Sequence, residues 1–205
     1  MKPPITLSVF REAGFAAEGT EVSDRLVRYA SESLGIPVRR VTLEELEQED
    51  ERFDIITLYS VLEHLPQPRT FLRSALRLLR PGGLLVIRIP IREALLVHLF
   101  GARHVVYREA PRHIWIPSMC GLEYGVQCEG PRMISRLPTS VIASAGSFSL
   151  SIYSGGSSAF TDTRSLGCYL SRRVCGAGLA IAGIPFALCE FLTRVTSETD
   201  FFFRK

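Results

Sequence analysis

Residues able to move a proton follow an apolar segment near the middle of the chain. The segment FDIITLY (53–59) is followed by Ser60, Glu63 and His64. Histidine is the side chain best able to exchange protons near neutral pH. His64 is therefore a candidate base that could deprotonate an acceptor. The alternative is that His64 only caps or orients the loop before Pro66.

A second candidate, Glu21, ends the short segment FAAEGTE (15–21), and Ser23 and Asp24 behind it are residues that cap helices. In doubly wound α/β sheets, ligands bind at the carboxyl ends of the strands, where an acidic residue can accept both hydroxyls of a ribose. Glu21 is thus a candidate ribose ligand, unless it is an ordinary solvent-exposed acid beside a helix start.

These residues need a sheet to bring them to one edge, and the sequence between 53 and 90 predicts one. Residues 53–59 are apolar enough for a strand buried on both faces, and LLVIRI (84–89) predicts the next strand. A helix is expected between them, from Pro68 to the stop at Pro81-Gly82-Gly83. Its apolar stripe comprises Phe71, Leu72, Ala75, Leu76 and Leu79. Strands separated by such a helix indicate parallel pairing and an α/β fold.

The N-terminal part repeats this alternation. Residues 15–21 predict a short strand, residues 26–34 a helix that stops at Gly35, and residues 36–41 a second strand. The acidic run 44–51 is expected to be a solvated helix or loop.

The second half of the chain is less regular. Residues 91–132 are expected to form a helix followed by a long stretch interrupted by Gly and Pro. A helix is expected over 133–145 despite Pro138, a strand over 148–153, and a last edge strand over 200–204. No internal repeat divides the chain, so a single domain over 1–205 is expected.

The composition fits one globular domain, with 205 residues, 46% of them hydrophobic and 22% charged. A net charge of +3, with scattered arginines, gives no reason to expect nucleic acid as a partner. The five cysteines form no C-x-x-C pair, so neither a disulfide framework nor a structural zinc site is expected. A cytoplasmic location is therefore expected. The N-terminus lacks the apolar core and cleavage site of a signal peptide.

Residues 174–192 are almost wholly apolar and are flanked by Arg172, Arg173 and Arg194. The segment is barely long enough to span a bilayer, which takes about 20 residues, and Glu190 would be costly in lipid. A buried or surface-packed helix is the first expectation. Peripheral contact with a membrane and a true span are the alternatives.

Taken together, the block FDIITLYSVLEHLPQPRTFLRSALRLLRPGGLLVIRIP (53–90) resembles the class I S-adenosylmethionine-dependent methyltransferases, in the branch with "V-L-E-H-L" and "L-R-P-G-G" signatures. The resemblance extends back through REAGFAAEGTEVS (11–23). It extends more weakly to ISRLPTSVIASAGSF (134–148), similar to the family's helix ending in "A-G-F", and to the closing TDFFFRK.

This resemblance implies a Rossmann-like methyltransferase sheet, mostly parallel with an antiparallel C-terminal edge, and S-adenosylmethionine as the cofactor. Residues 11–90 would form the cofactor-binding half, and residues 91–205 the acceptor-side half. The implied cofactor-binding residues are Glu21, Thr42, Leu43, Tyr59, Ser60 and Glu63. The first would accept the ribose hydroxyls, the next two would border the adenine, and the last three would lie beside the methionine part.

The resemblance also implies two catalytic histidines, His64 and His113. The second lies in PRHIWIP, similar to a Pro-x-His element near the acceptor pocket of many relatives, although a structural role for it is an alternative. Trp115 beside it would line an apolar acceptor site or belong to the core. Glu63 and His64 could instead bind a divalent ion, as in some relatives, but no metal site is expected here.

One departure from the family pattern matters. Relatives begin with a strand that runs into a glycine-rich loop, roughly D-x-G-C-G-x-G, and nothing in MKPPITLSV matches it. The sheet is therefore expected to lack its first, central strand, between the strands at 15–21 and 53–59. Three explanations are possible. The two favoured ones are a start recorded too far downstream and a degraded fragment, and the third is a strand supplied by another chain. Each backbone donor lost to the cofactor would cost about 1–3 kcal/mol.

Three functions follow from these expectations. The leading one is methyl transfer from S-adenosylmethionine to an oxygen or nitrogen of a small-molecule acceptor, which depends mainly on orientation and on a base. The second is a catalytically inactive methyltransferase-like fragment or interaction module. The third is a methyltransferase at a membrane surface with a lipid-like acceptor, motivated by residues 174–192.

Overall fold

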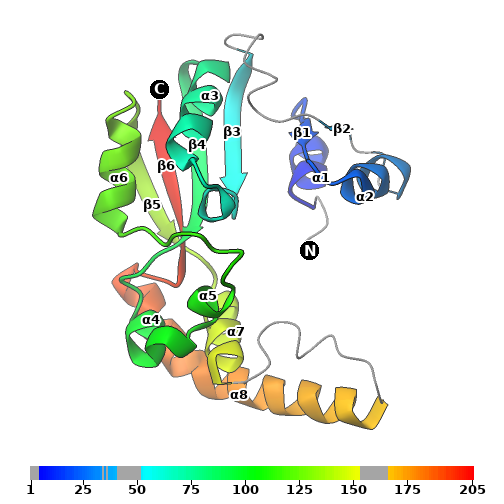
Figure 1. Cartoon of the computed structure of the whole chain (residues 1–205), viewed down its shortest axis with the longest axis vertical. Coiled ribbons are helices and arrows are strands. Elements are labelled where there is room, and N and C mark those ends of the chain that lie inside the picture. Colours follow the sequence, from blue (N-terminus) through cyan, green and yellow to red (C-terminus); the bar gives the residue numbers. More distant parts are fainter. Residues whose placement is uncertain (1–4, 34, 36, 41–51, 153–165) are drawn as a thin grey trace.

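The computed structural model describes residues 5–33, 35, 37–40, 52–152 and 166–205 (Figure 1). In chain order the elements are α1 (Ile5–Glu12), β1 (Gly19–Thr20), α2 (Asp24–Arg28), a π-helical turn (Tyr29–Ser33), β2 (Val38–Arg39), β3 (Phe53–Tyr59), a 3-10 turn (Leu62–His64), α3 (Pro68–Leu78), β4 (Leu79–Pro90), α4 (Leu95–Phe100), a 3-10 turn (Gly101–Arg103), α5 (Val105–Arg108), α6 (Met119–Gln127), β5 (Arg132–Pro138), α7 (Val141–Ile152), α8 (Leu166–Thr193) and β6 (Glu198–Arg204).

The main sheet has four strands in the order β3-β4-β6-β5. β3 pairs with β4 in parallel, whereas β6 runs antiparallel to both β4 and β5. Three of these strands therefore point one way, which confirms an α/β sheet with an antiparallel C-terminal part. One detail differs from the expectation, because residues 200–204 are not an edge strand. β6 lies inside the sheet, and β5 is the edge.

The position of β6 follows from its side chains. Phe201 and Phe203 alternate along the strand, are almost completely buried and belong to one apolar cluster with Leu85 and Ile87 of β4. The expected stripe of α3 packs on the same cluster through Leu72 and Leu76. The apolar side chains of β6 therefore share one core with those of β4 beside it.

The N-terminal residues form a small unit of their own. β1 and β2 pair in parallel over two residues each and do not join the main sheet (Figure 1). Among the described residues, an ion pair of 2.9 Å between Arg52 Nη2 and Glu18 links the start of β3 to the start of β1. β3 is thus an edge strand of the described sheet, with no strand bonded between it and β1, as the sequence predicts.

The remaining N-terminal elements are shorter than expected. The predicted strands over 15–21 and 36–41 are reduced to β1 and β2, and the helix over 26–34 is replaced by α2 and the π-helical turn. The predicted acidic helix or loop over 44–51 lies outside the described residues.

Two predictions for the second half are wrong. Residues 132–138 form strand β5 rather than the beginning of a helix, and Pro138 is tolerated because β5 is an edge strand. Residues 148–152 belong to helix α7 rather than a strand. Their polar–apolar alternation is misleading because Ser149 and Ser151 are buried and donate their hydroxyl hydrogens to backbone carbonyls, Ser149 to Gly176 O and Ser151 to Ser147 O.

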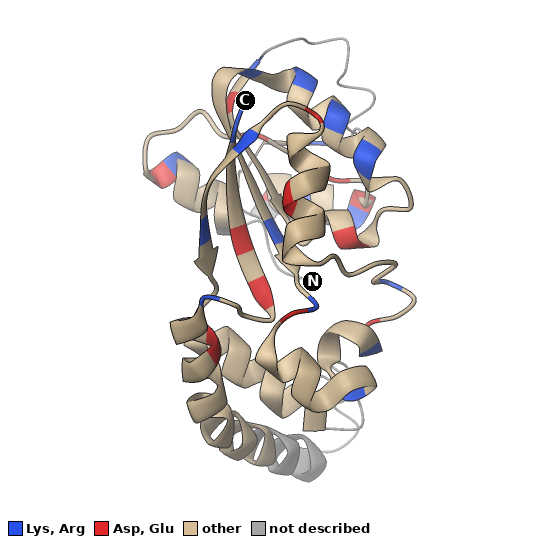
Figure 2. Cartoon of the chain, turned by 90° about the vertical axis from the view of Figure 1, so that its left-hand side faces the viewer, with Lys and Arg blue, Asp and Glu red and all other residues tan. Residues whose placement is uncertain are grey.

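The helices α4, α5, α7 and α8, called the helical layer below, lie beyond the end of the sheet at which β3 and β4 finish (Figure 1). The predicted apolar helix over 174–192 is part of α8. Charged residues occur mainly around the sheet, and few are coloured on the described part of the helical layer (Figure 2). The carboxyl ends of β3 and β4 therefore face a layer of different surface chemistry.

Candidate active site

The chain turns sharply where β3 ends. Ser60 has a left-handed backbone conformation (φ 53°), which residues other than glycine seldom adopt. Its amide still donates to Arg88 O of β4 at 2.9 Å, so the turn begins directly after the last rung of the sheet. The 3-10 turn Leu62–His64 follows and carries Glu63 and His64 to the carboxyl edge.

Residues 113–115 are held against this turn by two hydrogen bonds. Ile114 N donates to Glu63 O at 2.8 Å, and Trp115 Nε1 donates to Leu62 O, also at 2.8 Å. Trp115 packs against the main apolar cluster, which agrees with a place in the core rather than in an acceptor pocket. These bonds bring His113 to the turn although nearly fifty residues separate it from His64 in the sequence.

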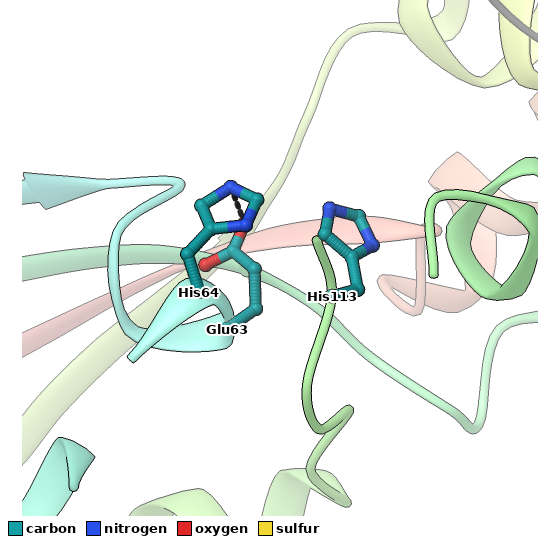
Figure 3. Close-up of side chains that lie close together, drawn as sticks. All are labelled: Glu63, His64 and His113. Atoms are coloured by element: carbon teal, nitrogen blue, oxygen red, sulfur yellow. Dashed lines mark ion pairs between the residues drawn. The ribbon is translucent and has the colours of Figure 1, made fainter. Parts of the chain in front are cut away.

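Glu63, His64 and His113 form one group, called the proton cluster below (Figure 3). One potential ligand atom from each residue lies within 4.8 Å of the others. His64 Nε2 is 4.0 Å from Glu63 Oε1, and the centroids of the two imidazole rings are 5.0 Å apart. The sequence-predicted catalytic histidines are therefore neighbours.

The backbone fixes the tautomer of both histidines. His64 Nδ1 lies 2.8 Å from Arg112 O, and His113 Nδ1 lies 2.7 Å from Val106 O. A carbonyl oxygen only accepts, so the hydrogen-bond network assigns the ring hydrogen to Nδ1 in each case. In the neutral rings Nε2 then carries the lone pair, which leaves it able to take a proton.

The electrostatics of the cluster are set by burial. Glu63 is almost fully buried, and burial raises the pKa of its carboxyl group. Its Oε2 has no hydrogen-bond partner among the described residues, which is costly unless a ligand or a proton supplies one. Burial also lowers the pKa of His113, so this ring is neutral at neutral pH.

The cluster suits a proton better than a divalent ion as it stands. Imidazole nitrogens and carboxylate oxygens bind zinc at about 2.0–2.2 Å, so two ligand atoms can be at most about 4.4 Å apart. The 4.8 Å spread of the three groups would have to close before an ion was held. Proton transfer between His64 and a bound acceptor needs no such closure.

Glu21 lies at the carboxyl end of β1 as the sequence predicts. Its amide donates to Arg39 O at 3.1 Å, and its Oε1 accepts from Ser23 N at 2.9 Å. Among the described residues Oε2 has no hydrogen-bond partner, so it is available to a hydroxyl. Thr42 and Leu43, the two residues expected at the adenine, lie outside the described residues.

Tyr59 has partners within the sheet. The guanidinium of Arg88 lies 4.7 Å from the centre of its ring, and Arg88 makes two bonds, of 2.6 and 2.7 Å, to the carboxylate of Asp200. Burial, and then the nearby Asp200, raise the pKa of the Tyr59 hydroxyl, so it stays protonated at neutral pH. This contact could not be predicted from the sequence, because it depends on the pairing of β6 with β4.

Comparison with known proteins defines the family. A family described as "Methyltransferase domain" matches residues 5–124, which is more than half of the chain. The chain therefore belongs to the methyltransferase family, in the class that uses S-adenosylmethionine, as the motifs of residues 53–90 predict.

Two curated relatives carry the same name, "Ubiquinone biosynthesis O-methyltransferase". The relative from Parvibaculum lavamentivorans is 35% identical over 101 residues, which cover 45% of this chain and 40% of the relative. The relative from Rhizobium etli is 33% identical over 106 residues, covering 48% and 42%. The matched part thus spans about two fifths of the length of these relatives.

A solved structure, an S-adenosylmethionine-dependent methyltransferase from Archaeoglobus fulgidus, shows the same fold. Its TM-score is 0.62 at 13% sequence identity, and the match covers 99% of this chain and 82% of that one. The similarity confirms the Rossmann-like architecture. The roles of individual residues must be inferred from the geometry of this chain.

The described residues suit S-adenosylmethionine, the cofactor of this class. Its ribose hydroxyls are donors that Glu21 Oε2 can accept, and its ammonium group is a donor suited to the unpartnered Glu63 Oε2. Both acceptors follow the carboxyl end of a strand, the usual place for such ligands in α/β sheets.

Proposed function

We propose that this chain transfers the methyl group of S-adenosylmethionine to a hydroxyl oxygen of a small-molecule acceptor. The observation that carries the proposal is the proton cluster beside the carboxyl end of β3, in which His64 Nε2 bears a lone pair. The relatives named as O-methyltransferases favour oxygen over nitrogen as the acceptor atom. By the same likeness, the acceptor is a phenolic compound related to ubiquinone precursors.

The residues of this chain would orient the reactants and move one proton. When bound, S-adenosylmethionine supplies an electrophilic methyl group on a positively charged sulfur. Glu21 holds the ribose, and the turn after β3 holds the amino acid end. His64 Nε2 would take the acceptor's hydroxyl proton as the carbon–oxygen bond forms and the bond from the methyl carbon to sulfur breaks, its electron pair staying on sulfur, because an alkoxide or phenolate oxygen is the better nucleophile.

The neighbours of His64 support this role. The Nδ1–H bond to Arg112 O fixes the ring, and the Glu63 carboxyl group 4.0 Å from Nε2 stabilises the imidazolium that results. His64 is partly exposed, at 31% of its side chain, so an acceptor can reach it. His113, whose pKa is lowered, is the poorer base and serves to position the acceptor.

The test uses methyl transfer from radiolabelled S-adenosylmethionine to 3,4-dihydroxybenzoate as a catechol probe. The substitution His64→Gln should lower kcat by about 10²–10⁴-fold, the usual contribution of a general base. The matched control is His98→Gln, an exposed residue of α4 whose ring also contacts a backbone carbonyl. Equal activity of the His64 variant and wild type would contradict the assignment, and no transfer by folded wild type to catechol or amine probes would contradict the proposed activity.

A further inference from the structure

α8 exposes large apolar side chains and buries small ones. Over its described turns the buried residues are Gly176, Gly183, Ala187 and Glu190, which form a narrow seam. Ile181 is 67% exposed and Leu192 79% exposed. A soluble amphipathic helix does the reverse, turning its large apolar residues to the core.

Length and composition identify residues 174–193 as a candidate membrane-spanning helix, and only 22% of its most apolar window is buried. The core helix of a soluble protein would be mostly buried, and a signal sequence would lie near the N-terminus. This helix is neither, because it lies close to the C-terminal end of the chain and its surface is exposed. Its side chains thus face outward in the described structure without protein to cover them.

α7 extends this surface. It packs on the seam of α8, where Phe148 meets Gly183 and stacks on Phe186 at 5.2 Å. Its outward residue Ile142 is 84% exposed. Neither α7 nor residues 174–189 of α8 contain a charged side chain. We call the outward side chains of Ile142, Ile152, Val174, Ile181, Leu188 and Leu192 the apolar face.

The single acid in this region does not interrupt the apolar face. Glu190 is fully buried, and its Oε1 accepts from Leu96 N of α4 at 2.9 Å. Ser197, just before β6, also lies against its carboxylate, at 3.4 and 3.5 Å. The charge is therefore directed into the protein, and the apolar face can lose water without uncovering it.

The same contacts favour a helix that stays on the protein over one that crosses the bilayer. α8 is held to the protein at three levels, by Ser149 at Gly176, by Phe148 at Gly183 and by Leu96 at Glu190. From Gly176 to Glu190 α8 consequently lies against the protein, and only its outward side is left to lipid there. That arrangement suits contact from one side of a membrane.

The ends of the apolar segment carry positive charge. Arg172 and Arg173 precede it and the exposed Arg194 follows it, with no acid between residues 163 and 189. Guanidinium groups bind phosphate oxygens in paired geometry, and basic residues beside an apolar surface are drawn to anionic lipid. A second copy of this chain would bring the same positive ends together, which disfavours a dimer through this face.

We propose that the apolar face docks onto the surface of an anionic phospholipid bilayer. The exposed Ile, Leu and Val side chains enter the outer acyl region, and the positive charge at the two ends of the segment draws it to anionic lipid. The methyltransferase fold would then hold the carboxyl edge of its sheet toward the membrane, because the helical layer lies beyond that edge (Figure 1). An apolar acceptor dissolved in the bilayer would be close to the proton cluster.

The test is flotation of the full chain with vesicles of phosphatidylcholine and phosphatidylglycerol, or of phosphatidylcholine alone. Wild type should float with the mixed vesicles, and less with the neutral ones. The double variant I181D/L192D should lower binding to the mixed vesicles at least tenfold. The matched control V9D places the same charge on an exposed apolar position of α1 and should bind as wild type does. The triple variant R172Q/R173Q/R194Q should lose the preference for anionic vesicles.

Three results would overturn the docking proposal, given melting curves that show every variant folded. The first is the absence of wild-type flotation. The second is a lipid-free dimer, seen by sedimentation velocity, that I181D/L192D dissociates. The third is retention in vesicles after an alkaline carbonate wash, which would indicate a span. Vesicle binding needs neither cofactor nor acceptor, so its failure and the failure of methyl transfer are separate results.

Discussion

At the scale of single residues, the side chains of the proton cluster could serve either in proton transfer or in metal binding. Glu63, His64 and His113 are ligands that a divalent ion accepts, and the Nδ1–H bonds leave both Nε2 atoms open to an ion or a proton, but ligand atoms up to 4.8 Å apart favour proton transfer. The distinction depends on a few tenths of an ångström and is open to direct measurement.

Removal of metal is the first prediction. Methyl transfer should persist within about twofold after dialysis against EDTA, because His64 acts as a base without an ion. The measurement is the transfer rate before and after dialysis, with MgCl₂ or ZnCl₂ added back in turn. Loss of activity that only an added ion restores would show that the cluster closes around a cation.

The protonation of His113 gives the second prediction. Burial lowers its pKa below the ordinary histidine value, so the ring should stay neutral to a lower pH than a free imidazole. Two-dimensional ¹H–¹⁵N spectra of the ring nitrogens, recorded between pH 4 and 8, measure the midpoint. The variant His113→Gln assigns the resonance by its disappearance. A midpoint above 6.5 would mean that the ring is not desolvated as the structure has it.

The sequence predicted these site residues through their types and motifs, but not their arrangement. His64 and Glu21 follow strands that periodicity reveals, so their place at a carboxyl edge could be foreseen. The approach of His113 could not, because it depends on bonds from Ile114 and Trp115 to a turn formed by distant residues. Such long-range bonds leave no local pattern.

At the scale of elements, the α7–α8 pair illustrates how small residues allow close packing. A Cβ atom placed on Gly183 would come within 2.7 Å of Phe148 Cβ, whereas one on Gly178 would meet nothing within 4 Å. Two glycines of the same helix therefore have different roles.

These glycines give the third prediction. Gly183→Ala should lower the free energy of unfolding by about 1–3 kcal/mol, because α7 must shift. Gly178→Ala is the matched control and should raise it by up to about 1 kcal/mol, since alanine favours helix. Urea denaturation of both variants measures the difference. Equal effects would mean that α7 does not pack on α8 at Gly183.

A buried polar chain joins the helical layer to the sheet. His104 is fully buried and accepts from Val106 N through Nδ1, so its Nε2–H faces Ser197 Oγ at 3.3 Å. Ser197 in turn contacts the carboxylate of Glu190. Burial lowers the pKa of His104 from 6.5 to about 4. The folded protein therefore holds this ring neutral.

The fourth prediction follows from the sign of that shift. Between pH 6.5 and 4 the unfolded chain binds a proton at His104 that the folded chain does not, so stability falls as the pH falls. The loss attributable to this ring is at most about 3 kcal/mol. Denaturation curves of wild type and His104→Gln at pH 7.5 and 4.5 should show a smaller pH dependence in the variant. The exposed His98→Gln control should keep the wild-type dependence.

The elements show where local patterns suffice. β3, α3 and β4 were predicted because their apolar runs and breakers are strong, and each contacts the next along the chain. The region 132–152 was mispredicted in both of its elements. There Pro138 is explained by pairing with Thr199 of β6, and the buried Ser149 by its bond to Gly176 of α8, and both partners lie far along the sequence.

At the scale of the whole molecule, the described chain consists of a small β1–β2 unit, a four-stranded sheet and the helical layer. Glu21 belongs to the first unit, and the proton cluster lies between the other two. Cofactor binding would require both units to face the same ligand. The Arg52–Glu18 ion pair links the start of β3 to the start of β1. The central claim is that these units together form a working cofactor site.

The measurement that tests this claim most directly is calorimetric titration of the purified chain with S-adenosylmethionine. We expect saturable binding that Glu21→Gln weakens about 10–100-fold, because it replaces the charged acceptor of a hydroxyl donor. The matched control Glu12→Gln, an exposed acid at the end of α1, should bind as wild type does. No binding at millimolar ligand by the folded chain would contradict the account, and so would equal affinities of Glu21→Gln and wild type.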